Sequence, residues 1–161
     1  MHAPEERSKK THKEKIVMLK KLYKEAPKEY AICWHSDCPR AATCLHQLAC
    51  QPLMEEQAIL RLINPNHCTK DEHCPYYRDS APVTYARGFT NMQKRMFPGQ
   101  YQTFMSILMK RFGRTPYFER RRGETAMPPK EQEIVLRALR QAGVTEDLKF
   151  DQYEENVNWH E

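Results

Sequence analysis

The chain of 161 residues has no apolar run long enough to cross a bilayer, and residues 1–15 lack the apolar core of a secretion signal. We therefore expect a cytoplasmic protein with no membrane partner. In a reducing cytoplasm, clustered thiols are more often metal ligands or reactive groups than disulfides. Disulfide pairing stays open as an alternative, because the number of cysteines, six, is even.

The sequence also lacks the common catalytic motifs. It has no glycine-rich phosphate loop, no serine, histidine and aspartate in a recognisable catalytic order, and no pair of carboxylates on one helix face. No Cys-x-x-Cys motif follows a βαβ pattern, although activated thiols at Cys38 and Cys74 would still permit a thiol-redox protein. We favour a non-enzymatic function, and no small-molecule substrate is evident.

Cysteine is absent outside residues 33–74 but dense within them. This stretch contains Cys33, Cys38, Cys44, Cys50, Cys68 and Cys74, with His35, His46, His67 and His73 between them. Thiolate and imidazole are the preferred ligands of zinc. Such a concentration of both in a short stretch predicts a bound metal.

The identity of the metal stays open at this point. Zinc sites commonly have two to four residues between paired cysteines. The Cys33-x4-Cys38 spacing is at this limit, and the Cys68-x5-Cys74 spacing exceeds it. Wider loops and cysteines followed by proline also suit an iron–sulfur cluster. We expect structural zinc, with an iron–sulfur cluster or no metal as alternatives. A histidine, His35 or His73, is an alternative ligand.

Positive charge is concentrated in two segments of a chain whose formal net charge is +5. Residues 1–30 carry nine lysines and arginines against five acids, which is typical of a solvated arm or an exposed helix. Residues 94–124 carry eight against two and interleave arginine with aromatic residues. The second segment is therefore the better candidate for an anion-binding surface.

Apolar periodicity predicts a mainly α, small single domain of about five to seven helices with a cysteine-rich, metal-stabilised N-terminal half. The helices are expected over residues 9–25, 43–53, 54–63, 89–96, 101–112, 115–122 and 129–143, and residues 64–85 are expected to form a loop. We expect a basic arm or helix over residues 1–27 and one domain over 28–161, with a cysteine-rich half, 28–85, and a helical half, 86–161.

Residues 101–124 predict two short helices separated by Gly113, similar to a helix-turn-helix in which the second helix enters the major groove. The alternatives are a surface helix held by salt bridges to the acidic tail and an adaptor that docks an acidic protein partner. Tyr117 is expected either to pack inward or to stack on bases. The candidate nucleic-acid-binding residues are Lys110, Arg111, Arg114, Tyr117, Arg120, Arg121 and Arg122.

The sequence contains four distinctive motifs: Cys33-x4-Cys38-Pro39-x4-Cys44, Cys74-Pro75-Tyr76-Tyr77-Arg78, Ala86-Arg87-Gly88-Phe89-Thr90 and Phe112-Gly113-Arg114. Together they resemble an uncharacterised Bacteroidales family of small proteins, a domain of unknown function. The resemblance covers roughly residues 28–159 and leaves the lysine-rich arm outside. It implies no activity, but it does imply that Cys33, Cys38, Cys44 and Cys74 form the shared framework, with Cys50 and Cys68 as additions.

Helix geometry supports these four cysteines as the metal ligands. On one unbroken helix, Cys38 and Cys44 would lie about 9 Å apart along the axis and on different faces. We therefore expect a turn after Cys38, with Thr43 capping a helix that has Cys44 in its first turn. Cys50 would then point away as a buried free thiol, and Cys74 would complete the site from a distant loop.

Overall fold

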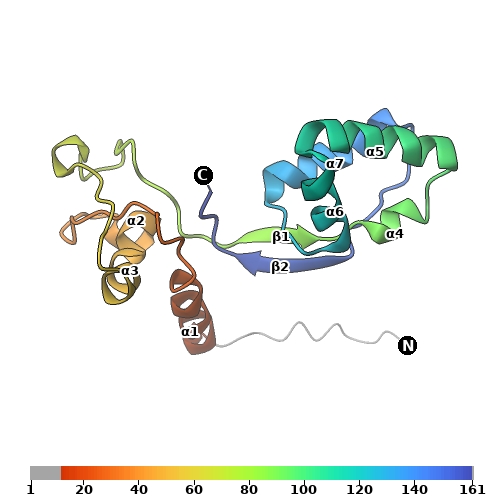
Figure 1. Cartoon of the computed structure of the whole chain (residues 1–161). Helices are drawn as coiled ribbons and strands as arrows, with labels where there is room; N and C mark the ends of the chain where they lie inside the picture. The colour runs from red at the N-terminus through yellow and green to blue at the C-terminus, as the bar shows by residue number, and fades with distance from the viewer. Residues whose placement is uncertain (1–11, 161) are drawn as a thin grey trace, which may run out of the picture. The chain divides into compact units, whose positions relative to one another are not determined.

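The computed structural model describes residues 12–160, which form a mainly α-helical protein with a small two-stranded sheet (Figure 1). This confirms the predicted mainly α class. The described residues divide into two compact units. Unit 1 runs to Ala81 and also contains Trp159 and His160, and unit 2 comprises Pro82–Asn158.

Unit 1 is built from short helices joined by extended segments. Its elements are α1 (His12–Tyr23), η1 (Ala41–Thr43), α2 (Leu45–Leu48), α3 (Cys50–Glu56) and η2 (Pro65–His67). Helix α1 lies within the helix predicted over residues 9–25, of which residues 9–11 fall outside the described part of the chain. The side chains of Ile32, Leu45, Ala49 and Leu53 are buried in this unit.

The expected break between Cys38 and Cys44 is present. A turn and then the short 3-10 helix η1 follow Cys38. The backbone of Cys44 is extended, with φ −93° and ψ 121°. Cys44 therefore directly precedes α2, whereas its predicted position was in the first turn of this helix. No side chain caps this helix end in the described structure.

The helix predicted over residues 54–63 is wrong beyond Glu56. Helix α3 ends at Glu56, and the following segment is extended because it pairs with Ile32. Ile32 donates its N–H to the Arg61 carbonyl (2.9 Å), and Ile63 donates to the Ile32 carbonyl (2.9 Å). The pairing buries Ile32 but leaves Ile59 88% exposed, so the apolar pattern did not mark a buried helix face.

Unit 2 combines four helices with a two-stranded sheet. Its elements are β1 (Val83–Arg87), α4 (Thr90–Gln93), α5 (Pro98–Phe112), α6 (Arg114–Arg122), α7 (Pro129–Gln141) and β2 (Gln152–Asn156). Helices α6 and α7 contact the sheet, and α5 packs on these two helices. The strands pair antiparallel, with Val83 opposite Asn156 and Arg87 opposite Gln152. The sequence predicted a loop where β1 begins and no strand at β2, because neither segment alternates apolar and polar residues along a long run.

The core of unit 2 is one apolar cluster, and each helix of the unit contributes side chains to it. Phe89 and Met92 come from the segment around α4, Phe104 from α5, Tyr117 from α6 and Val135 from α7. Helix α5 starts three residues before the predicted position because Pro98 occupies its first turn, where a missing N–H has no cost. It ends before Gly113, whose φ is +90°, as predicted.

Gly88 is a point where the fold of unit 2 requires glycine. Its φ is +72°, and a Cβ added there would lie 2.6 Å from the Asp151 carboxylate. Asp151 cannot move freely, because this carboxylate accepts hydrogen bonds from the backbone N–H groups of Thr90 and Asn91, each 2.9 Å long. It therefore satisfies the free donors at the start of α4.

We predict that Gly88→Ala lowers the free energy of unfolding by about 1–3 kcal/mol, through backbone strain and displacement of Asp151. Urea unfolding followed by circular dichroism measures this change. Gly99→Ala is the matched control, since a Cβ at Gly99 meets nothing within 4 Å. Equal unfolding midpoints for the two variants would contradict the prediction.

Candidate metal centre

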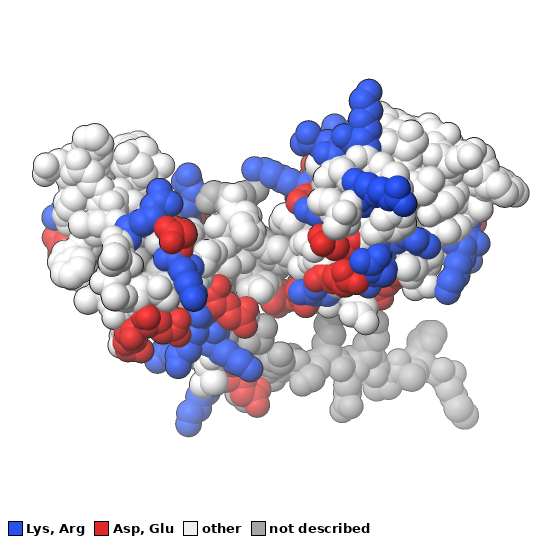
Figure 2. All heavy atoms as spheres, viewed as in Figure 1, with Lys and Arg blue, Asp and Glu red and all other residues white. Residues whose placement is uncertain are grey.

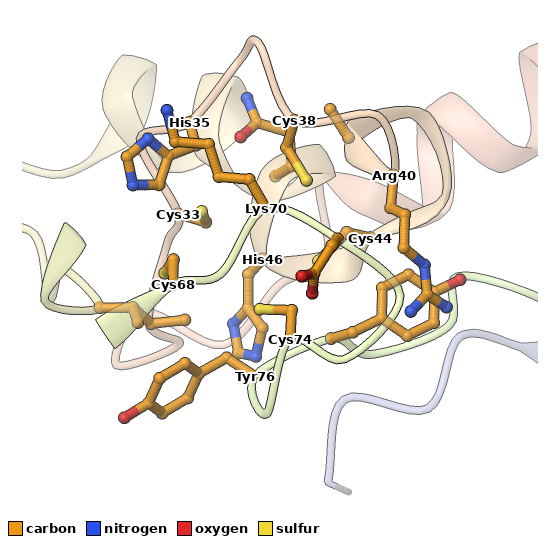
Figure 3. Close-up of a pocket in the computed structure, with 15 residues that line it drawn as sticks. Cys33, His35, Cys38, Arg40, Cys44, His46, Cys68, Lys70, Cys74 and Tyr76 are labelled. Carbon is orange, nitrogen blue, oxygen red and sulfur yellow. The ribbon is translucent and has the colours of Figure 1, made fainter. Parts of the chain in front are cut away.

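Five of the six cysteines line one small cavity in unit 1, with a volume of about 20 Å³ (Figure 3). They are Cys33, Cys38, Cys44, Cys68 and Cys74. The structure thus brings together the four predicted ligands and adds Cys68, which the family resemblance set apart. A cavity of this size admits about one water-sized body, such as a single ion.

The first three cysteines reach the cavity from the segment between Ile32 and α2. Cys33 follows the paired residue Ile32 and donates its N–H to the His46 carbonyl (3.0 Å). Cys38 lies in a turn in which the Ala41 N–H donates to its carbonyl (2.9 Å). Cys44 forms an isolated bridge with Asp79, and this bridge anchors the start of α2.

The other two cysteines come from the loop that follows η2. Cys68 directly follows η2, and Cys74 lies in a turn in which its N–H donates to the Asp71 carbonyl (3.3 Å). Lys70, between them, has φ +56°, a conformation that few residues other than glycine adopt. This turn allows the chain to return to the cavity within a few residues.

Arg40 and Tyr77 hold this loop against the turn at η1. The Arg40 guanidinium carbon lies 3.2 Å from the centre of the Tyr77 ring, and the guanidinium donates to the Glu72 carbonyl (3.1 Å). The Tyr77 hydroxyl donates to Thr43 Oγ1 (3.1 Å). These contacts involve Glu72 and Tyr77, which lie on either side of Cys74 in the sequence. They therefore hold Cys74 in position at the cavity.

His46 lines the same cavity and was not singled out by the sequence analysis. Its Nδ1 lies 2.6 Å from the Ala31 carbonyl, and its ring stacks on Tyr30 with centroids 4.8 Å apart. Because a carbonyl only accepts, Nδ1 carries the proton and the lone pair is on Nε2. Burial lowers the pKa of His46, so the neutral ring is favoured. A histidine fixed in this way is typical of metal ligands.

The two histidines proposed as alternative ligands differ in position. His35 lines the cavity and contacts the Pro65 carbonyl through Nε2 (3.2 Å). The side chain of His73 is 81% exposed and does not line the cavity. Only the first lies near the thiols.

The thiols in the cavity affect one another electrostatically. Burial, together with the neighbouring thiols of Cys33 and Cys74, raises the pKa of Cys68 to about 11. Burial and Cys33 also raise the pKa of Cys50, which lies outside the cavity with its sulfur 3.6 Å from that of Met54. A divalent cation among such thiols would reverse the effect, because it stabilises thiolates.

The side chains do not form a metal centre as they stand. Over residues 12–160, no three histidine, cysteine, aspartate or glutamate side chains are grouped so that they could hold a metal ion. All six cysteines are free thiols. The structure therefore gives a convergence of thiols around a cavity and no formed coordination sphere.

The predicted arginine-rich site lies in unit 2, and part of it is engaged in ion pairs. Arg120 makes two hydrogen bonds to the Glu131 carboxylate, 2.8 and 2.9 Å long, and Arg122 pairs with Glu124. The ring of Tyr117 is fully buried and packs inward, which was one of its two predicted positions. Arg121 is half-buried, and its Nε is buried without a hydrogen-bond partner in the described structure.

The remaining candidates, Lys110, Arg111 and Arg114, are exposed at the junction of α5 and α6. Among residues 12–160, the structure shows no acidic partner for any of the three. Figure 2 shows lysine and arginine side chains on the visible face of unit 2, some beside acidic side chains and some apart from them. The free positive charge of this segment is thus smaller than its composition indicates.

These features define a mainly α protein with a cysteine-lined cavity, and no helix among its described residues is long and apolar enough to cross a membrane. The chain belongs to DUF6078, a family of unknown function whose model matches residues 12–159. Comparison with curated proteins and with solved structures gives no match.

We predict that Arg40→Ala loosens the loop that carries Cys74, because the variant loses the ring contact and the hydrogen bond to Glu72. A loss of about 1 kcal/mol corresponds to roughly fivefold faster labelling of Cys74 by a maleimide in metal-free, reduced protein. Peptide mass spectrometry measures the labelling rate of each cysteine.

Arg61→Ala is the control, since the Arg61 guanidinium donates to the Glu29 carbonyl (3.2 Å), outside this loop. Cys74 should be labelled at the wild-type rate in this variant. An unchanged rate in Arg40→Ala would show that Arg40 does not hold the loop.

Proposed function

We propose that this protein is a non-enzymatic zinc-binding protein and that Cys33, Cys38, Cys44 and Cys74 are its metal ligands. The observation that carries the proposal is the convergence of these side chains on one cavity from two separate segments of the chain, residues 33–44 and the loop after η2. Thiolates bind zinc about 2.3 Å from the metal in tetrahedral sites, so the side chains would have to turn inward on binding.

The size of the cavity favours one zinc ion over an iron–sulfur cluster. About 20 Å³ of space suits one ion, whereas a cluster contains several iron and sulfide atoms. Four protein thiolates leave no position for a substrate, so the ion would stabilise unit 1 and would not catalyse a reaction. His46 and Cys68 lie beside the four and are the substitutes that the cavity offers.

We predict that protein purified without air is colourless and contains about one zinc per chain, as measured by elemental analysis. Cys33→Ser and Cys74→Ser should each lose most of the zinc and lower the thermal midpoint. Cys50→Ser should keep both, because Cys50 does not line the cavity. Brown protein with visible absorption would indicate an iron–sulfur cluster, and protein that retains no metal after exposure to excess zinc would refute the proposal.

We further propose that the protein binds nucleic acid, with a regulatory role, through Lys110, Arg111 and Arg114. The support is that these three exposed cations lie within five residues at a helix-turn-helix-like junction, with no acidic partner among the described residues. Arg120 and Arg122 are left out of the contact surface because they already pair with carboxylates. The alternative is an adaptor that uses the same cations to dock an acidic protein.

We predict that the triple change of Lys110, Arg111 and Arg114 to alanine weakens binding to duplex DNA or RNA and reduces the salt dependence. Each lost phosphate contact lowers the slope of log K against log salt by about 0.9, so the three together lower it by up to about 2.7. Fluorescence anisotropy with pooled oligonucleotides at several salt concentrations measures both quantities.

The control for this triple variant changes Lys94, Arg137 and Arg140 to alanine, which removes equal charge from other exposed positions of unit 2. It should keep most of the affinity. No binding of wild-type protein to any DNA or RNA pool at low salt would refute the nucleic-acid proposal and favour the adaptor.

A further inference from the structure

The cavity contains one more thiol than a tetrahedral zinc site uses. Cys68 lines it together with the four proposed ligands, and its side chain lies beside those of Cys33 and Cys74 (Figure 3). The sixth cysteine, Cys50, lies outside the cavity.

The positions of Cys33 and Cys68 favour bond formation between them. Cys33 is fixed by the pairing of Ile32 with residues 61–63, and η2 begins two residues after that segment and ends directly before Cys68. Cys33 thus lies one residue, and Cys68 six residues, beyond the bridged residues Ile32 and Leu62, and both line the cavity. The contact of the Cys68 thiol with the Asn64 carbonyl is long, 3.8 Å, so rotation of the thiol toward Cys33 breaks only a weak interaction.

We propose that Cys33 and Cys68 form an oxidisable pair that reacts with hydroperoxides, and this inference rests in part on the proposed zinc site. The Cys33 sulfur attacks the peroxide, cleaves the O–O bond and becomes a sulfenic acid, with release of water or an alcohol. The Cys68 thiol then displaces the hydroxyl group, which leaves as water with the thiol proton. Two thiols lose two electrons, the peroxide gains them, and one disulfide forms.

The disulfide would remove one proposed ligand from the cavity. A sulfur atom in a disulfide has no thiolate charge to offer a cation, so Cys33 would no longer bind zinc. Cys38, Cys44 and Cys74 would remain, and the affinity for the metal would fall. Oxidation would thus be coupled to loss of the ion, and reduction by a thiol would restore the site.

The experiment treats metal-free and zinc-loaded protein with a small excess of hydrogen peroxide. Intact mass, tryptic mapping with fragmentation, and the absorbance of a zinc-binding dye are recorded together. We expect a Cys33–Cys68 disulfide with a mass loss of about 2 Da in both forms, since two hydrogens are removed. Zinc release should accompany it in the loaded form.

In Cys68→Ser the sulfenic acid at Cys33 has no partner thiol at residue 68, so this variant should gain about 16 Da, one oxygen atom, instead of forming the Cys33–Cys68 disulfide. Cys50→Ser should behave like the wild type. A disulfide between Cys68 and Cys74, or no disulfide at all, would overturn the inference. If the disulfide forms but the wild type binds no zinc, the oxidisable pair stands and the proposed zinc function fails. If zinc binds and no disulfide forms, the proposed zinc function stands and the oxidisable pair fails.

Discussion

The cysteine-lined cavity depends on main-chain pairing between segments that are far apart in the chain. Ile32 pairs with residues 61–63, the Cys33 N–H bonds to the His46 carbonyl, and Cys44 bridges to Asp79. These contacts satisfy backbone groups that would otherwise be buried without partners. They also place the cysteines around one space, so the convergence of thiols results from the path of the backbone and does not require a bound ion to explain it.

In unit 2, pairing of charges decides which of the many basic residues remain available to a partner. Arg120 and Glu131 are both largely shielded from water, with side-chain exposures of 15% and 26%, and their two-point contact is of the stronger kind. Arg87 similarly bonds Glu154 across the sheet (3.0 Å). Among the residues that the structure describes, some basic residues of unit 2 therefore form ion pairs within the unit, and others remain as unpaired positive charge on its surface.

The sequence was sufficient for features that local chemistry controls. The amphipathic pattern of α5 and α7, the end of α5 at Gly113 and the break after Cys38 follow from side-chain spacing, glycine and proline. Long-range pairing was not predictable. The extended segment after Glu56 and the strand pair β1–β2 form because distant backbone groups satisfy each other, and the positions of Cys68 and His46 beside the cavity depend on that same pairing.

The two units differ in how much apolar surface they bury. Unit 2 has a continuous cluster that includes Phe89, Phe104 and Tyr117, whereas the buried apolar side chains among the described residues of unit 1 are Ile32, Leu45, Ala49, Leu53 and Trp159. Small units with few buried side chains usually need a cross-link or a metal to stay closed. Local opening of unit 1, with the exposure of its backbone to proteases, would then set the lifetime of the chain in a cell.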